Sequence, residues 1–186
     1  VIQGLVKFCR TIPQLPDPAS KKFIPGATPP GITPGMSREE IIARLENIRR
    51  ENPSAELAFH SYRDLNRADP APFLKAAIER NPVSALATQD MDIPTVIEKI
   101  NAMPAESIYD EAGRLAQPDE VWNYGRGDGA EKALLFANIL RDRAPDDQIS
   151  IAISSEGATL NSGSASNHFP SGKHLKPQNW LIPRTA

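Results

Sequence analysis

Cysteine is nearly absent from this sequence, since Cys9 is the only one in 186 residues. A single cysteine excludes a disulfide within the chain and every zinc site built from several cysteines. Histidine is also scarce, with only His60, His168 and His174. None of the three pairs at a His-x-His or His-x3-His spacing, so we predict no metal site. We also expect no cofactor.

Charge of one sign and long apolar runs are lacking as well. The 21 basic and 23 acidic side chains leave a net charge of −2, so no strong field draws the chain to nucleic acid or to an anionic membrane. No run approaches the ~20 apolar residues of a membrane-spanning helix. We therefore expect neither a nucleic-acid partner nor a membrane span. The compartment stays open, because a cysteine-poor chain suits a periplasmic, extracellular or cytoplasmic location.

Proline is abundant instead, at 18 residues, and seven of these lie between positions 13 and 34. Proline removes a backbone donor and restricts the residue before it, so neither a helix nor a central strand can persist there. We predict a proline-rich N-terminal arm over residues 1–36, which begins with a short apolar strand or helix. A proline-rich ligand of a recognition domain is the alternative for this arm. Residues 37–186 correspond to one domain.

The first half of that domain is predicted to consist of short helices. Ser37 and Glu40 form a capping box, and the apolar residues Ile41, Ile42 and Leu45 follow at helical spacing. This first helix is expected to stop at residues 52–53. Further along, the sequence favours a strand over residues 55–59 and helices over residues 73–79 and 92–100, each bounded by proline.

The second half has a different pattern. A glycine-rich turn over residues 125–129 opens the strongest helix, residues 130–143, which is rich in alanine and leucine and expected to be buried. Asp128 and Glu131 place negative charge at its start, where it complements the helix dipole. Alternation of isoleucines predicts a strand over residues 148–153. Residues 154–171 are predicted as a long loop and residues 180–182 as a last short strand.

Two runs in this half carry a resemblance to a known family. They are Ala116-Gln117-Pro118-Asp119-Glu120-Val121 and Gly125-Arg126-Gly127-Asp128-Gly129-Ala130-Glu131-Lys132-Ala133-Leu134-Leu135. Together with the order of the following elements, they resemble the core of the transglutaminase-like, papain-related superfamily. The resemblance covers about 70 residues and is specific from Gly127 to Leu135. It implies an α+β fold, with helices first and then a central helix packed on a small antiparallel sheet.

The resemblance also implies where catalytic residues would lie, and two of three are missing. The family places a nucleophilic cysteine after a Gly-Asp pair, and this position holds Gly129. The catalytic histidine is matched by His168, with His174 as second choice. The strand near Trp180 offers Ile182 and Arg184 where the family has an aspartate. Because a thiolate activated by histidine is the core of that chemistry, we expect an inherited fold without the inherited activity.

The resulting prediction is a non-catalytic binding or scaffold domain. Its cleft is predicted at the start of the helix over residues 130–143, lined by Trp122, Asp128, Gly129 and His168, with His168 as a remnant of the catalytic base. The ligand would be a peptide segment or a partner domain. Two alternatives stay open: a cysteine-dependent hydrolase or acyltransferase whose nucleophile is altered here, and a glycan-binding domain of a surface enzyme.

Overall fold

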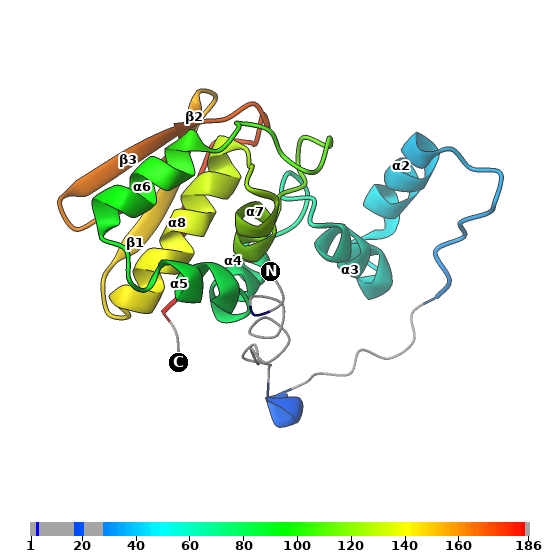
Figure 1. Ribbon diagram of the computed structural model, residues 1–186. Coiled ribbons are helices and arrows are strands. Elements are labelled where there is room, and N and C mark those ends of the chain that lie inside the picture. Colours follow the sequence, from blue (N-terminus) through cyan, green and yellow to red (C-terminus); the bar gives the residue numbers. More distant parts are fainter. Residues whose placement is uncertain (1–2, 4–16, 21–27, 185–186) are drawn as a thin grey trace.

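The computed structural model describes residues 3, 17–20 and 28–184 (Figure 1). Within the proline-rich arm, Pro18–Ser20 forms one short 3-10 turn, η1, and residues 28–36 contain no helix or strand. The apolar element predicted at the beginning of the arm falls, except for Gln3, outside the described residues. In the described ranges, no helix has the length and apolar character needed to cross a membrane.

Seven α-helices and one four-stranded antiparallel sheet make up the described part of the chain, so the predicted α+β class is confirmed. The helices are α2 (Arg38–Ile48), α3 (Pro53–Tyr62), α4 (Ala71–Glu79), α5 (Pro82–Thr88), α6 (Ile93–Ala102), α7 (Pro118–Tyr124) and α8 (Gly129–Arg143). Helix starts follow the capping signals in the sequence. The capping box of Ser37 and Glu40 is present at α2, and the Asp92 side chain caps α6 by accepting from the Thr95 amide.

The predicted strand over residues 55–59 is wrong, because these residues lie in α3. Asn52 does not only end the preceding helix. Its side-chain oxygen accepts hydrogen bonds from the amides of Ser54 and Ala55, and Pro53 occupies the first helical position. The next Asn-Pro pair also precedes a helix, α5, which the sequence does not predict, but Asn81 makes no side-chain cap there. The Asp119 carboxylate accepts from the Val83 and Ser84 amides instead. An Asn-Pro pair in this chain therefore starts a helix as well as stopping one.

The predicted loop over residues 154–171 is also wrong. It contains β2 (Gly157–Ser162) and β3 (Ala165–Pro170), which form an antiparallel pair, while β1 (Ile149–Ile153) and β4 (Gln178–Leu181) agree with the predicted strands. The strand order is β3-β2-β1-β4. In β2, Ala158 and Leu160 are buried, and in β3 Phe169 is buried, whereas most other positions are polar. Only one face of this hairpin contacts the core, so its composition resembles that of a loop.

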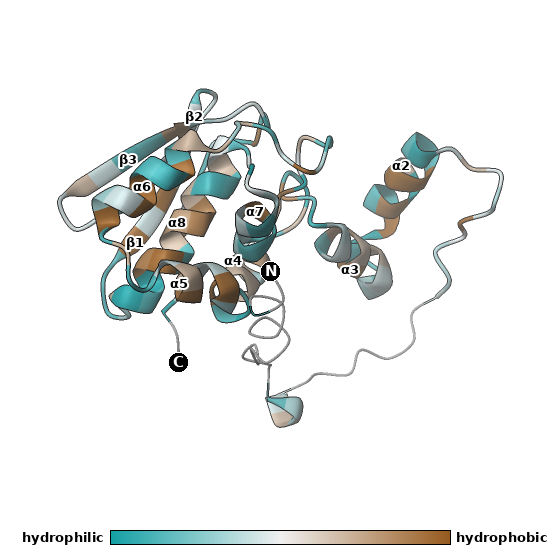
Figure 2. Cartoon of the chain, viewed as in Figure 1, coloured by the Kyte–Doolittle hydropathy of each residue, from teal (hydrophilic) through white to brown (hydrophobic). Residues whose placement is uncertain are grey.

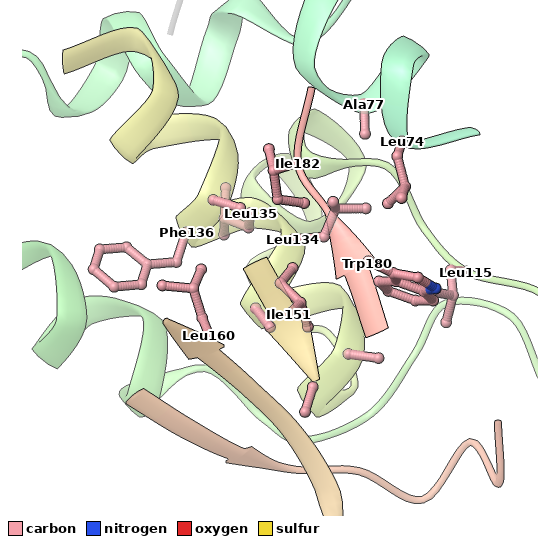
Figure 3. Close-up of a cluster of buried hydrophobic side chains, with 14 of the residues drawn as sticks. Leu74, Ala77, Leu115, Leu134, Leu135, Phe136, Ile151, Leu160, Trp180 and Ile182 are labelled. Atoms are coloured by element: carbon pink, nitrogen blue, oxygen red, sulfur yellow. The ribbon is translucent and has the colours of Figure 1, made fainter. Parts of the chain in front are cut away.

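Helix α8 lies against the sheet and forms the centre of the main core (Figure 1). Twelve of its 15 residues are buried, as the sequence predicts. Figure 3 shows Leu134, Leu135 and Phe136 among side chains from α4 and from the sheet. The hydropathy colouring in Figure 2 shows brown residues on α8 and on the helices packed around it, alternating with teal ones. Burial of this apolar surface is what fixes α8 in place.

Helices α2 and α3 form a hairpin with its own small apolar cluster, separate from the main core. Leu45, Ala55, Phe59 and Ala68 are buried in it, and Ile42 packs against them half-buried. Figure 1 shows this hairpin to one side of the body that holds α8 and the sheet. We call residues 38–62 the helical hairpin from here on.

The junction between the helical hairpin and the body is polar. Asp64 and Arg114 form an isolated β-bridge, and the Leu65 amide donates to the Gly113 carbonyl. Arg63 donates to the Glu120 carboxylate from 2.7 Å. Burial and the hydrogen bonds from Arg63 and the Gln117 amide act on Glu120 in opposite directions, and the hydrogen bonds prevail, so the pKa of Glu120 lies below its ordinary value. The junction thus joins Arg63 to Glu120, which lies 57 positions later in the sequence.

Candidate functional site

The start of α8 is closed by hydrogen bonds. Asp128 is its N-cap and forms a capping box with Glu131. The same Asp128 carboxylate accepts from the Ser171 hydroxyl at 2.5 Å and from the Gly172 amide at 2.8 Å, which ties the helix to the segment after β3. Asp128 is only 5% exposed. Its contacts are thus those of a buried structural carboxylate.

Gly129, the position that would hold the nucleophile, is packed against the backbone of β3. A Cβ atom on Gly129 would lie 2.5 Å from the carbonyl oxygen of Phe169 and closer still to that of Pro170. Real Cβ atoms do not approach other heavy atoms within 3.0 Å. A side chain of any kind is therefore excluded here unless the backbone moves. This packing gives Gly129 a structural reason to be glycine.

His168 precedes Phe169 and Pro170 on β3, but its side chain is on the face of the sheet opposite α8. Phe169 contacts Phe136 of α8 edge to face, and successive side chains of a strand point to opposite faces. The imidazole of His168 is exposed, and its Nδ1 lies 3.0 Å from the Thr159 hydroxyl. His168 therefore does not face Gly129.

The other expected positions do not complete a cleft either. Trp122 of α7 is half-buried against the main core, and Lys99 lies over its ring at 5.6 Å. Where the family has an aspartate, Ile182 is buried and Arg184 is exposed. Asp128 and Gly129 are adjacent at the start of α8, and His168 is on the other face of the sheet. A ligand contact of Trp122, Asp128, Gly129 or His168 stays a prediction.

A groove of about 620 Å³ lies elsewhere, between the helical hairpin and the loop over residues 111–114. Its apolar floor comes from the helical hairpin and its rim is charged. The apolar residues are Ile41, Ile42, Leu45, Ala58 and Phe59, and the charged ones are Arg38, Asp64, Arg67, Glu111 and Arg114. We call this the hairpin groove. Its size and its combination of an apolar floor with polar groups at the rim are typical of binding sites.

The sequence places the floor of the groove on one face of α2. Ile41, Ile42 and Leu45 follow one another at helical spacing, as the sequence indicates. In the structure Leu45 is 9% exposed and the two isoleucines are half-buried. Helix α3 covers only part of this face. What the sequence analysis missed is the open side that remains.

One end of the hairpin groove is closed by an arginine, a tyrosine and a glutamate. Arg38 donates to the Tyr62 hydroxyl at 2.9 Å, and Tyr62 in turn donates to Glu111 at 2.5 Å. The hydrogen bond from Tyr62 lowers the pKa of Glu111, and the charges of Arg114 and Arg38 lower it further. Glu111 is therefore an ionised acceptor at neutral pH.

The other end is closed by a second arginine. Arg67 donates to Asp64 at 2.8 Å and to Glu46 of α2 at 2.5 Å. These two hydrogen bonds raise the pKa of Arg67, so it stays cationic throughout the accessible pH range. Since Arg38 and Glu46 lie near opposite ends of α2, the hairpin groove runs along that helix.

The wall of the hairpin groove opposite α2 is held by a buried lysine. The Lys173 ammonium donates to the backbone carbonyls of Tyr109, at 2.5 Å, and Glu111, at 2.9 Å. Its burial, at 5% exposure, lowers the pKa of Lys173. Lys173 lies just after the Ser171 and Gly172 contacts of Asp128. The segment that binds Asp128 at the start of α8 therefore also holds the groove wall at Glu111.

Among the described residues, no three or more histidine, cysteine, aspartate or glutamate side chains are placed to hold a metal ion. Comparison with known proteins adds no assignment: the chain matches no family model, no curated protein and no solved structure.

Proposed function

We propose that this chain is a non-catalytic protein-binding domain that holds a peptide segment in the hairpin groove. The segment comes from a partner protein or from another domain of a longer chain. The observation that carries the proposal is the apolar floor made by Ile41, Ile42 and Phe59 beside a polar rim. A floor of this kind loses contact with water when an apolar segment covers it, which favours binding.

The fold that we propose behind this function is transglutaminase-like. Supporting it are the Gly127–Leu135 motif, its place at the start of the central helix, and the antiparallel sheet that follows in chain order. The packing of Gly129 against Phe169 and Pro170 argues against the alternative of an enzyme whose nucleophile has merely been exchanged. A cysteine at this position would require the backbone of β3 to move. We therefore propose a pseudoenzyme whose helix start has become a packed structural element, rather than an enzyme in which only the nucleophile has been replaced.

Peptide selection followed by a matched pair of variants tests the proposal. Peptides selected from a random display library on the wild-type protein would be synthesised with a fluorescent label, and their dissociation constants measured by anisotropy. Ile42→Glu places a charge on the apolar floor, whereas Leu57→Glu places one on the same helical hairpin at an exposed residue outside the groove. Circular dichroism and melting curves of both variants show whether the helical hairpin stays folded.

We expect Ile42→Glu to weaken peptide binding at least tenfold, because the carboxylate would be desolvated under the peptide without a partner. Leu57→Glu should bind as the wild type does. If the selected peptides bind both variants equally, or if no peptide is selected, the hairpin groove is not a peptide site and the proposal fails.

A further inference from the structure

Four of the five charged residues that line the hairpin groove are already paired. Arg38 is engaged by Tyr62 and lies 3.6 Å from Glu111, and Arg67 is engaged by Asp64. Within the described residues, the exception is Arg114. Its guanidinium makes no hydrogen bond or salt bridge there. Its Nε is buried without a partner, whereas its two terminal nitrogens are not among the buried unpaired atoms. The Glu111 carboxylate interacts with the Arg114 charge but makes no ion pair with it, so the terminal N–H groups keep donors for a ligand.

Two tyrosine rings hold the Arg114 side chain in place. The guanidinium lies 3.9 Å from the centre of the Tyr109 ring and 4.9 Å from that of Tyr62. Stacking uses the faces of the guanidinium, whereas its terminal N–H groups lie in its plane and stay free to donate. Tyr62 and Tyr109 are themselves fixed by hydrogen bonds to Glu111 and Glu120. Arg114 is thus oriented before any ligand binds, which reduces the entropy lost on binding.

Arg114 lies between the two closed ends of the hairpin groove. It stacks on Tyr62, which belongs to the Arg38 end, and its backbone pairs with Asp64, which belongs to the Arg67 end. A peptide that follows the groove would therefore pass Arg114 along its length rather than end there. This position favours a side chain of the peptide as the partner of Arg114, not its C-terminal carboxylate.

We propose that Arg114 pairs with an aspartate or glutamate side chain of the bound peptide. The hairpin groove would then select partner segments in which an acidic residue is flanked by apolar ones. A carboxylate is the partner that the forked donors of a guanidinium fit best. The chain's own N-terminal arm carries the basic residues Lys7, Arg10, Lys21 and Lys22 against one acidic residue, Asp17. The Asp17 carboxylate accepts from the Ala19 amide in its own turn, so charge complementarity favours a partner protein over the arm. This inference depends on the proposed function.

The test is a double-mutant cycle with the selected peptides. Their acidic residues would be changed singly to asparagine or glutamine, and each peptide measured on wild type, Arg114→Gln and Arg114→Lys. Arg126→Gln is the control, because Arg126 lies outside the groove and its ion pair with Glu106 is exposed. Melting curves of Arg114→Gln would show whether this variant stays folded.

We expect the selected peptides to be enriched in aspartate or glutamate. Neutralising one such residue should weaken binding about tenfold on wild type and on Arg126→Gln, but less than twofold on Arg114→Gln. Arg114→Lys should restore only part of the loss, because lysine keeps the charge without the fork. Binding to wild type should also weaken with added salt more steeply than binding to Arg114→Gln.

Three outcomes would overturn the inference. If peptides respond to Ile42→Glu but lose the same affinity on wild type and Arg114→Gln when neutralised, the proposed function stands and the role of Arg114 fails. If only amidation of the peptide C-terminus abolishes binding, the carboxylate is terminal and not a side chain. If Ile42→Glu has no effect on any peptide, or if it abolishes self-association of the chain instead, both proposals fail.

Discussion

Replacing Gly129 by alanine should destabilise the protein although alanine is the better helix former. The added Cβ would lie 2.5 Å from the Phe169 carbonyl oxygen and closer to that of Pro170, and neither oxygen belongs to a side chain that can turn away. Overpacking of this kind costs about 1–3 kcal/mol, and contact with sheet backbone favours the upper part of that range. The gain in helix propensity offsets up to ~1 kcal/mol. The net loss is therefore roughly 2 kcal/mol.

Urea and thermal unfolding measure this loss, with Gly172→Ala as the matched control. Gly172 lies beside the same helix start, and a Cβ there meets no atom within 4 Å. For a protein of this size, about 2 kcal/mol corresponds to a fall in Tm of roughly 4–8 °C, whereas the control should change little. Equal stabilities for Gly129→Ala and wild type would refute the reasoning, because the start of α8 would then be open enough for the predicted cleft.

Three further predictions concern the same region and its surroundings. Asp128→Ala should lower the free energy of unfolding by about 2–4 kcal/mol in urea titrations, because it removes a helix cap and leaves the Ser171 hydroxyl and a backbone amide without their acceptor; a loss below 1 kcal/mol would contradict this. The pKa of Glu120 is lower in the folded state, so its contribution to stability is complete above its unfolded value of about 4.3 and is lost as the pH falls through the folded value. Glu120→Gln should therefore make stability less dependent on pH between pH 5 and pH 3, and an unchanged slope would show that the Arg63 pair contributes nothing. His168→Ala should change stability by less than about 0.5 kcal/mol and leave peptide affinity as it is, because the side chain is exposed; a clear loss of affinity would move the site to the open face of the sheet.

Local signals explain which elements the sequence predicts well. Ser37 and Asp92 cap their helices through side chains a few residues from the backbone groups they bind, so the pattern is complete within one segment. The isoleucines of β1 alternate for the same reason. Asn52 misled the prediction because it ends one helix region and starts another, and a stop signal alone does not distinguish the two.

Long-range contacts explain what the sequence could not predict. The β2–β3 hairpin keeps few apolar residues because one of its faces meets solvent, so Ala158, Leu160 and Phe169 do not stand out from the serines and asparagines around them. The apolar face of α2 is legible in the sequence, but its partial covering by α3 is not. Arg114 becomes a candidate only when Tyr62, 52 positions earlier, is seen beside it.

The resemblance to the transglutaminase-like superfamily predicts a binding cleft at the start of α8, whereas the binding site that we propose is the hairpin groove. The two are connected through one segment: Ser171 and Gly172 bind Asp128, and Lys173 holds the groove wall at Tyr109 and Glu111. In this account the helix start serves as a structural support.

The most direct test of the account is to map a selected peptide onto the protein by amide chemical shifts. Titration of the unlabelled peptide into ¹⁵N-labelled protein reports which backbone amides change surroundings. We predict that the largest changes occur in α2, in α3 and at residues 111–114. Changes concentrated instead at residues 127–130 and 168–172, with the helical hairpin unaffected, would contradict it and restore the cleft at the start of α8.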